Sequence, residues 1–472
     1  MPLNPADQGF ATHLSTLLPE GCISTAEPAY LEEPRGRAGT PEAALARPRT
    51  TQEVAVIVRA CAAARVGIVP WGGGTGLVLG QVMPNGPAPV IVSLERMAAL
   101  RGIWPDENVL VVEAGMTLAD VQSAAAAADR LFPLSLASEG TARIGGNLAT
   151  NAGGTAVLRY GNARDLCLGV EAVLPDGTVL QGLKRLRKDN TGYDLRNLLI
   201  GSEGTLGIIT AATLRLFPRP AVAATAMFAV AGPDAALRLL SLAQARTGGA
   251  VSTFELIHHQ GLAFLDEVMP TLRQPFDDRP EWSVLAEIGL PPGTDPGAVL
   301  AAIWADAEAE DLVIDAVVAS TEAQRLQLWD LREALPEANR RIGAVVSHDI
   351  SLPLSEIAGF LPRAGAAIAA LGPYRINCFG HLGDGNLHYN IFPPKGGRAL
   401  DHAGRAAELQ RVVHDLVDAH GGSISAEHGV GRYKSAELVR YGDPGKLSAM
   451  RALKAALDPQ GIMNPGAVLS DD

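Results

Sequence analysis

The chain has 472 residues, more than the roughly 250 to 300 at which a single hydrophobic core stops growing, so two or three packed cores are expected. Its composition, 47% hydrophobic and 19% charged, is that of a globular protein. The 51 acidic and 39 basic residues give a formal net charge of −12, and a surface this acidic gains little from counterion release on nucleic acid. Nucleic acid is therefore excluded as a partner class.

The cellular location is predicted from the cysteines and the N-terminus. The four cysteines are far apart and form no CxxC pair, which is typical of unpaired thiols in a reducing compartment. The first ten residues have neither a basic nor an apolar signal region. Arg59 and Arg65 interrupt the most apolar early segment, so no stretch reaches the roughly 20 apolar residues of a membrane helix. We predict a cytoplasmic protein without a transmembrane segment and with at most peripheral membrane contact.

The first 220 residues are predicted to form a mixed domain of helices and strands. The first elements in order are a helix and three strands, at residues 50–66, 68–72, 90–94 and 108–115. A second helix begins at the cap residue Thr117. The alternating strand pattern at 207–218 is closed by Pro218 and Pro220, where a domain boundary is expected.

From residue 221 to 424 the sequence predicts a second domain, in which amphipathic helices alternate with strands. The clearest strand patterns lie at 282–290, 312–320, 344–353 and 374–382. This order favours an α+β domain built on an antiparallel sheet. Its last helix ends at Gly421, and residues 425–472 add a glycine-rich segment and a terminal helix.

Three glycine-rich segments punctuate the first domain. The first, Pro-Trp-Gly-Gly-Gly-Thr-Gly at 70–76, leaves backbone N–H groups free to approach an anion such as a pyrophosphate. By itself a plain tight turn explains it equally well, and it matches neither the GxGxxG nor the P-loop pattern. The second, at 140–154, is too rich in glycine and amide side chains for an efficient core, and the third lies at 201–210.

Together with RKDNTGYDLRNLLIGSEGTLGIIT at 187–210, these segments resemble the motifs of PCMH-type flavoproteins of the vanillyl-alcohol-oxidase superfamily. The resemblance is to the branch of D-2-hydroxyglutarate and D-lactate dehydrogenases, and it extends from Pro48 to Val468. It implies an α+β protein with a two-part FAD-binding domain, a substrate domain on an antiparallel sheet, and a C-terminal segment that returns to the FAD domain. The expected boundaries are 1–220, 221–424 and 425–472.

The resemblance also implies that the glycine-rich segments bind FAD. Since the first segment contains Thr75 and no histidine, the FAD is expected to be non-covalent. The residues implied to hold it are Pro70, Gly72, Gly73, Gly74, Thr75, Gly76, Gly140, Thr141, Gly145, Gly146, Asn147, Thr150, Asn151, Gly153, Gly154, Gly204, Gly207, Ile209 and Asn464.

Two further motifs, GHLGDGNLHYN at 380–390 and SAEHGVG at 425–431, indicate a metal centre. A strand, a tight Asp-Gly turn and a second strand can bring His381 and His388 together, and Glu427 lies in a glycine-flanked loop. Two histidines and a glutamate with an open position form a catalytic divalent site. Both motifs match the same dehydrogenase branch, which implies these three ligands. Zinc is expected first, with manganese or iron as alternatives, and Asp384 is interpreted as shaping the turn.

The resemblance assigns roles to three more residues. His428 is implied to take the proton of a substrate 2-hydroxyl, while a hydride passes from C2 to flavin N5. Arg332 matches a family arginine that grips a substrate carboxylate. Asn390 shares a strand face with His388 and is predicted to bind the C1 carboxylate or the hydroxyl.

The sequence departs from the hydroxyglutarate-specific pattern at two positions near the distal carboxylate. Where those members have a lysine and a threonine, this chain has Ser347 and Pro336. His348 is a poor substitute because it points to the opposite face of its strand. Loss of the cation weakens selection for a second carboxylate, so D-lactate, D-malate and apolar D-2-hydroxy acids are expected alongside D-2-hydroxyglutarate.

Two other functions stay open from the sequence. One is a metal-free alcohol or aldonolactone oxidase on the same FAD domain, and the other is an electron-relay subunit of a glycolate-oxidase-type complex. The electron acceptor is expected to be an electron-transfer flavoprotein, a quinone or a cytochrome. The sequence does not choose between a monomer and a homodimer.

Overall fold

A computed structural model describes residues 2–470, which form two compact units. Of the described residues, the first unit joins 2–153, 161–219 and 427–470, and the second joins 154–160 and 220–426. Each unit has hydrophobic cores of its own. The chain therefore leaves the first unit and later returns to it.

One half of the first unit is a four-stranded sheet in the order β1-β2-β4-β3, in which β2 and β3 both run parallel to β4. Its strands are β1 (Ile23–Thr25), β2 (Ala44–Ala46), β3 (Ile68–Trp71) and β4 (Val90–Ser93). The same part of the chain contains the helices α1 (Gln8–Thr16), α2 (Pro28–Leu31) and α3 (Thr51–Ala64). The side chain of Thr50 caps α3 by accepting from the Glu53 N–H, and Ile57 and Val58 bury the helix against this sheet.

The other half is a five-stranded antiparallel sheet in the order β5-β6-β10-β8-β9. Its strands are β5 (Leu100–Trp104), β6 (Val109–Glu113), β8 (Cys167–Val173), β9 (Val179–Gln181) and β10 (Ile208–Arg215). Smaller elements are η1 (Pro105–Glu107), α4 (Leu118–Ala127), α5 (Ile144–Ala149), α7 (Leu195–Leu199) and the pair β7 (Arg130–Leu131) and β11 (Phe217–Pro218). The predicted cap Thr117 of α4 is confirmed.

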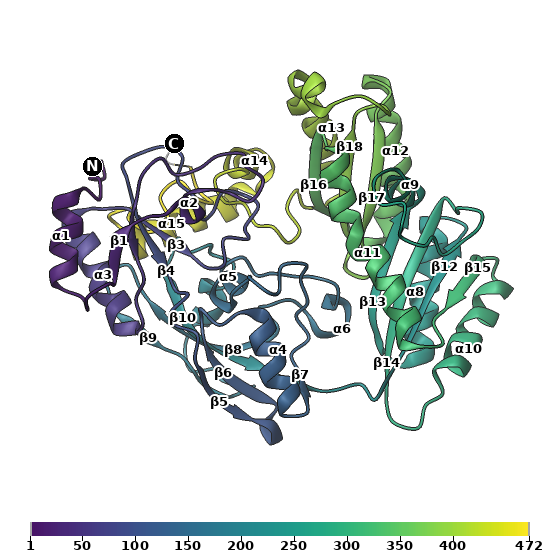
Figure 1. Cartoon of the computed structure of the whole chain (residues 1–472), viewed down its shortest axis with the longest axis horizontal. Helices are drawn as coiled ribbons and strands as arrows, with labels where there is room; N and C mark the ends of the chain where they lie inside the picture. Colours follow the sequence, from purple (N-terminus) through teal and green to yellow (C-terminus); the bar gives the residue numbers. More distant parts are fainter. Residues whose placement is uncertain (1, 471–472) are drawn as a thin grey trace. The chain divides into compact units, whose positions relative to one another are not determined.

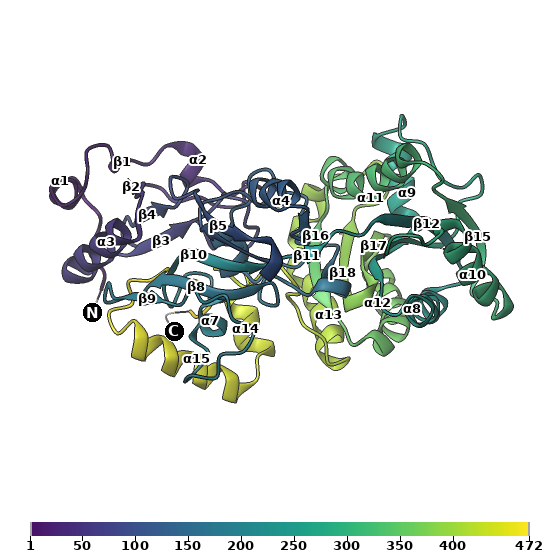
Figure 2. The ribbon, with the colours of Figure 1, turned by 90° about the horizontal axis from the view of Figure 1, so that it is seen from below.

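The C-terminal segment belongs to the first unit, as predicted, and contains α14 (Ser435–Tyr441) and α15 (Pro444–Leu457). After α15 the chain lies beside β3: the Ile68 N–H donates to the Ile462 carbonyl, and the Asn464 N–H donates to the Ile68 carbonyl. Ile462 and Met463 are fully buried in the same core as α3. Figure 2 shows this segment in yellow beside the strands of the first unit.

The second unit is built on a seven-stranded antiparallel sheet, as predicted, in the order β15-β12-β14-β13-β17-β18-β16. Its strands are β12 (Val222–Val230), β13 (Val251–His258), β14 (Trp282–Leu290), β15 (Val313–Val318), β16 (Val346–Ser351), β17 (Arg375–His381) and β18 (Asn386–Phe392). Short 3-10 helices are η2 (Leu354–Glu356), η3 (Leu382–Asp384) and η4 (Ala399–Arg405).

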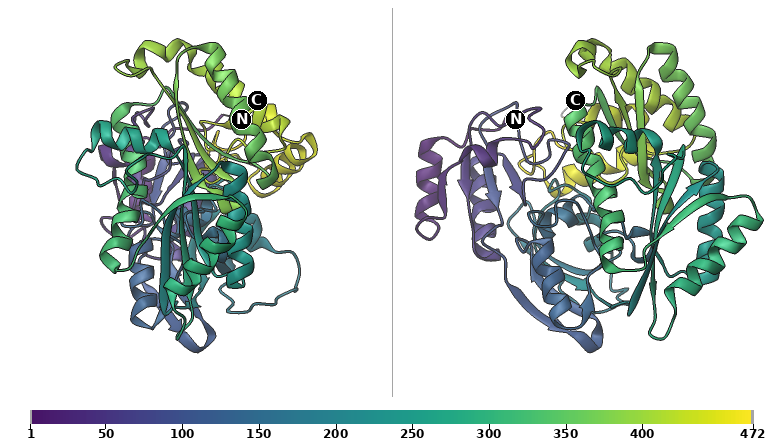
Figure 3. Two further views of the ribbon diagram at one scale, coloured as in Figure 1. Left: turned by 90° about the vertical axis from the view of Figure 1, so that its right-hand side faces the viewer. Right: turned by 45° about the vertical axis from the view of Figure 1, so that its right-hand side comes forward.

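Helices cover both faces of this sheet (Figures 1 and 3). On one face pack α8 (Pro233–Thr247), α10 (Pro296–Ala309), α12 (Ile357–Leu371) and α13 (Ala406–Ala419), and on the other pack α9 (His259–Val268) and α11 (Glu322–Ile342). Strand alternation divides the cores: Phe228 of β12 packs on the first face and Met227 on the second. Gly421 has a φ of +67°, as predicted for the end of α13.

A short excursion adds residues 154–160, with α6 (Val157–Tyr160), to the second unit. Arg159 fixes this piece, because its Nη1 donates to the carbonyls of Ala250 and Gly289 and to the hydroxyl of Ser252. The second glycine-rich segment thus runs directly into an element of the other unit.

Within the described residues, Leu354–Leu371 is one stretch whose length and composition would allow it to cross a membrane, with a mean hydropathy of 1.3. It carries the charged residues Glu356 and Arg363. Phe360 and Ile368 are fully buried in the core of the second unit. Since 28% of the stretch is buried, it packs on the sheet along one face.

Candidate active site

The first unit contains a cavity of about 450 Å³, which is within the range of roughly 300 to 1,000 Å³ typical of small-molecule sites. All three glycine-rich segments contribute to its wall, together with Glu427, His428 and Asn464. Predicted FAD residues in the lining are Pro70, Gly72, Gly73, Gly74, Thr75, Gly76, Gly145, Gly146, Asn147, Thr150, Gly153, Gly204, Gly207, Ile209 and Asn464. Gly140, Thr141, Asn151 and Gly154 are outside the lining.

The glycines allow two backbone segments to meet without side chains between them. A Cβ on Gly72 would lie 3.3 Å from the Cα of Gly146, and one on Gly73 would lie 2.1 Å from the Thr141 carbonyl oxygen. Gly74 has a φ of +70°, a conformation that favours glycine. Asn147 presents a buried Nδ2 that has no hydrogen-bond partner among residues 2–470. The accessible backbone N–H groups and the amide donor of Asn147 fit FAD, because the phosphates and ring carbonyls of FAD are hydrogen-bond acceptors.

A buried carboxylate anchors the loop that follows Glu427 and His428. Glu203, which is 8% exposed, accepts hydrogen bonds from the N–H groups of Val430 (2.7 Å) and Gly431 (2.8 Å). Burial raises the pKa of Glu203, although these two donors act in the opposite direction. The Nδ2 of Asn464 donates to the Glu203 carbonyl at 2.8 Å. The loop is thereby fixed to the third glycine-rich segment.

Within this loop, His428 Nε2 lies 3.7 Å from Glu427 Oε1. Both side chains are partly exposed and line the same cavity as the glycine-rich segments. An imidazole in this position can accept a proton from a molecule bound in the cavity.

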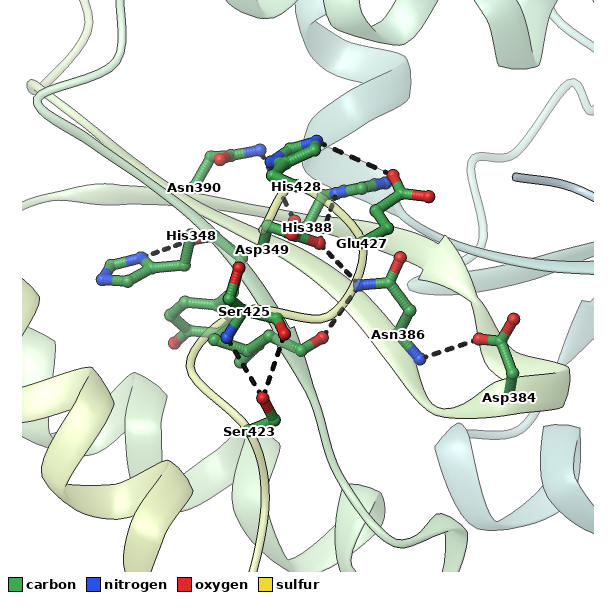
Figure 4. Close-up of polar contacts among 12 residues, drawn as sticks. His348, Asp349, Asp384, Asn386, His388, Asn390, Ser423, Ser425, Glu427 and His428 are labelled. Carbon is green, nitrogen blue, oxygen red and sulfur yellow. Dashed lines mark hydrogen bonds and ion pairs between the residues drawn. The ribbon is translucent and has the colours of Figure 1, made fainter. Parts of the chain in front are cut away.

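In the second unit, the structure brings the two predicted metal histidines together. His381 ends β17 and His388 lies on β18, with ring centroids 5.7 Å apart and ring planes at 82°. In the turn between the strands, Asp384 Oδ1 accepts from the Asn386 N–H at 3.1 Å, so this carboxylate shapes the turn as interpreted. Figure 4 shows Asn386 reaching to Asp349, whose Oδ1 accepts from Asn386 Nδ2 at 2.9 Å.

Glu255 on β13 connects the histidine pair to Arg332. Its Oε1 lies 2.6 Å from His381 Nδ1, and its Oε2 accepts from Arg332 Nε at 2.8 Å and lies 2.7 Å from Nη2. Glu255 is fully buried, which by itself raises its pKa, but the interactions with His381 and Arg332 outweigh burial and hold the pKa at about 2. Glu255 was not predicted from the sequence. The available signal was a lone acidic residue inside the apolar strand VSTFELIH.

The predicted substrate residues lie on the sheet face covered by α9 and α11. Asn390 on β18 is paired with Ser347 on β16, and Ser347 is exposed. His348 points to the core side, as expected, with its Nδ1 2.7 Å from the Tyr389 carbonyl oxygen. Pro336 lies within α11 four residues after Arg332, so it supplies no N–H to the Arg332 carbonyl.

The chain approaches Glu427 along the edge of β16. Ser351 and Ser423 exchange two backbone hydrogen bonds, of 3.0 and 2.8 Å, and the Ala426 N–H donates to the Asp349 carbonyl at 3.2 Å. Glu427 is joined directly to Ala426 by a peptide bond. The backbone that leads into Glu427 therefore lies beside β16, and β16 pairs with the strand that carries His388.

Family models match most of the chain. The FAD binding domain matches residues 41–182, and the C-terminal domain of FAD linked oxidases matches 219–468. A solved structure of p-cresol methylhydroxylase superimposes with a TM-score of 0.77 at 17% identity, covering 99% of both chains. One of alkyldihydroxyacetonephosphate synthase has a TM-score of 0.74 at 16% identity, covering 98% of this chain and 86% of the other. These two likenesses establish the fold.

Curated relatives are more similar in sequence. The mitochondrial D-2-hydroxyglutarate dehydrogenase of Bos taurus is 38% identical, over 90% of this chain and 76% of its own. The D-2-hydroxyglutarate dehydrogenase of Xanthomonas citri pv. viticola is 34% identical, over 90% of this chain and 88% of its own. A putative mitochondrial D-lactate dehydrogenase of Schizosaccharomyces pombe is 33% identical, over 89% and 80%.

The fold and the glycine-lined cavity define a flavin-dependent oxidoreductase that acts on CH–OH donors. The chain belongs to the FAD-linked oxidase family of PCMH-type flavoproteins, in the branch that contains the D-2-hydroxyglutarate dehydrogenases. The predicted family resemblance is thus confirmed. Some of these relatives are mitochondrial by name, and the cytoplasmic location of this chain stays a prediction.

Proposed function

We propose that the chain is an FAD-dependent D-2-hydroxy acid dehydrogenase that uses a divalent metal held by His381, His388 and Glu427. The observation that carries the proposal is the place of His428: this imidazole follows Glu427 in the chain and lines the cavity formed by the FAD-binding segments. A proton acceptor beside a flavin is what oxidation of an alcohol requires.

The donor set fits a metal. His381 and His388 present two imidazoles side by side, and the Nδ1 of His381 faces a carboxylate, the usual arrangement for a metal-binding histidine. Two nitrogens and one carboxylate with an open position suit zinc, with manganese or iron as alternatives. When bound, the metal would supply positive charge that lowers the pKa of a neighbouring hydroxyl, and FAD would accept the hydride from C2.

The chain's own residues then bind, orient and deprotonate the substrate. The guanidinium of Arg332 binds a carboxylate, and the amide of Asn390 donates to the C1 carboxylate or to the hydroxyl. His428 removes the hydroxyl proton at one ring nitrogen. Preference for the D enantiomer is supported by the names of the relatives.

The substrate range follows from the departures at Ser347 and Pro336. A neutral, exposed serine next to Asn390 does not select for a second carboxylate. We therefore include D-lactate, D-malate and apolar D-2-hydroxy acids with D-2-hydroxyglutarate. The electron acceptor would be an electron-transfer flavoprotein, a quinone or a cytochrome.

A dye-reduction assay tests this function without any partner protein. The purified chain should reduce an artificial acceptor with D-2-hydroxy acids, lose this activity on chelation, and regain it with Zn²⁺ or Mn²⁺. His428→Gln should lower kcat/KM by about 10²- to 10⁴-fold, the usual contribution of a general base, whereas His402→Gln, in η4 of the second unit, should leave it unchanged. Activity that survives both chelation and His428→Gln would overturn the proposal.

A further inference from the structure

The two carboxylate oxygens of Glu255 contact different partners, which indicates a role beyond stabilising the fold. Within residues 2–470, Oε1 contacts the imidazole of His381, whereas Oε2 contacts two nitrogens of Arg332, Nε and Nη2. All three side chains are buried. A fully buried carboxylate has a high desolvation cost unless partner groups bind its oxygens. Both oxygens of Glu255 have such a partner.

The contact with His381 fixes the tautomer of the ring. A carboxylate only accepts, so the proton of a neutral His381 must be on Nδ1, and the lone pair must be on Nε2. A metal-binding histidine needs a ring nitrogen without a proton. Glu255 therefore keeps Nε2 of His381 available as a ligand atom.

The contact with Arg332 fixes the direction of the guanidinium. The edge formed by Nε and Nη2 is turned to Glu255, and Nη1 makes no hydrogen bond within the described residues. The plane of the group is further held above the ring of Phe379, with Cζ 4.9 Å from the ring centroid. The edge formed by Nη1 and Nη2 is left for a carboxylate, which matches it bidentately.

We propose that Glu255 is a positioning residue that prepares the two halves of substrate recognition together: it sets His381 for the metal and Arg332 for the substrate carboxylate. This role rests on the proposed function, since it requires His381 to bind a metal. Glu255 itself touches neither the metal nor the substrate.

Glu255→Gln tests the proposal, because an amide offers one acceptor and one donor in place of two acceptors. If its oxygen accepts from Arg332, its NH₂ faces His381 Nδ1 and drives the ring proton to Nε2, the atom that the metal needs. Glu255→Asp is the second variant: it keeps the charge but is one methylene shorter, so it cannot reach both partners.

The matched control is Glu287→Gln. Glu287 lies on the neighbouring strand β14, where its Oε2 accepts from Arg325 Nη1 (2.8 Å), Trp329 Nε1 (2.8 Å) and the Thr225 hydroxyl (3.0 Å). This variant loses another Arg–Glu pair between α11 and the same sheet, and it leaves His381 untouched. It separates a loss of stability from a loss of positioning.

The primary readout is the Zn²⁺ dissociation constant, measured by competition with a chelator, together with the visible spectrum of the Co²⁺-loaded protein. We expect Glu255→Gln to weaken Zn²⁺ binding by about 10- to 100-fold, as removal of other outer partners does, and to alter the Co²⁺ spectrum. Glu255→Asp should weaken it less, and Glu287→Gln should not change it. At saturating metal, both Glu255 variants should raise KM for a D-2-hydroxy acid more than they lower kcat.

The outcomes separate the two proposals. Wild-type affinity for Zn²⁺ in both Glu255 variants, while the wild type binds it, would overturn the role of Glu255 and leave the metal site intact. A wild-type protein that binds no divalent metal would overturn the proposed function and this role together. Equal weakening by Glu287→Gln would show that Glu255 acts only through the stability of the sheet.

Discussion

Glu203 and Val430 are joined by a 2.7 Å hydrogen bond, although they are 227 positions apart in the sequence. The bond connects the third glycine-rich segment of the FAD-binding unit to the loop that carries His428. The side chain of Glu203 thus helps to determine where the proposed base lies in the wall of the cavity.

Removal of this carboxylate should loosen the cavity. Glu203→Ala leaves the partly buried N–H of Val430 and the buried N–H of Gly431 without their acceptor, at a cost of up to about 1 to 3 kcal/mol for the buried group. We expect the dissociation constant of FAD to rise at least about tenfold, measured by fluorescence titration of the apoprotein. Glu33→Ala is the control, since Glu33 is also a buried carboxylate that accepts from two backbone N–H groups, those of Arg35 and Arg37. Equal FAD affinity in the two variants would contradict this prediction.

Substrate preference should respond to one charge at Ser347. Ser347→Lys places an ammonium on the exposed side of β16, opposite Asn390. A charge-assisted hydrogen bond is worth about 1.5 to 3 kcal/mol, so kcat/KM for D-2-hydroxyglutarate relative to D-lactate should rise by about 10- to 100-fold. Ser347→Met supplies similar length without charge and should not raise this ratio. If both variants shift it equally, side-chain bulk and not charge sets the preference.

The stability of the second unit should depend on His258. Burial, and after it the neighbouring His259, lower the pKa of His258 from 6.5 to about 4. The unfolded chain therefore takes up the proton first, so the stabilising contribution is complete above pH 6.5 and is lost as the pH falls from 6.5 to 4. His258→Asn retains a cap acceptor for the Gln260 N–H but does not titrate. Between pH 7.5 and 5 the urea midpoint should fall more for the wild type than for this variant, and parallel falls would refute the prediction.

The FAD should be held without a covalent bond. The glycine-rich loop at 70–76 contains no histidine, and its Thr75 lines the cavity. Acid precipitation should release essentially all of the flavin into the supernatant, read by its absorbance. Flavin retained in the pellet would show a covalent link, and His428→Gln would test whether this lining residue forms it.

Much of the site could be predicted from sequence because its signals are local. The glycine runs, the His381 and His388 turn and the two strand faces follow from spacing and alternation within a few residues. The antiparallel sheet of the second unit and the return of the C-terminal segment were also expected, the latter through the family resemblance.

The parts that sequence reasoning missed depend on contacts between distant segments. Glu255 meets Arg332 and His381 only because β13 pairs with β17 and α11 packs across them. Glu203 accepts hydrogen bonds from N–H groups far along the chain, and Arg159 donates hydrogen bonds to carbonyls in the second unit. A single acidic or basic residue in an apolar or glycine-rich stretch indicates that a partner exists, but not which one.

Anaerobic absorbance spectroscopy can show whether a D-2-hydroxy acid reduces the flavin without a partner protein and with the help of a metal. The purified protein is mixed with D- and L-lactate, malate and 2-hydroxyglutarate before chelation, after chelation, and after Zn²⁺ is restored. We predict that only D-acids bleach the visible flavin band, that chelation abolishes the bleaching, and that the metal restores it. A flavin that no acid reduces with metal present, or that is reduced equally well without metal, would contradict it.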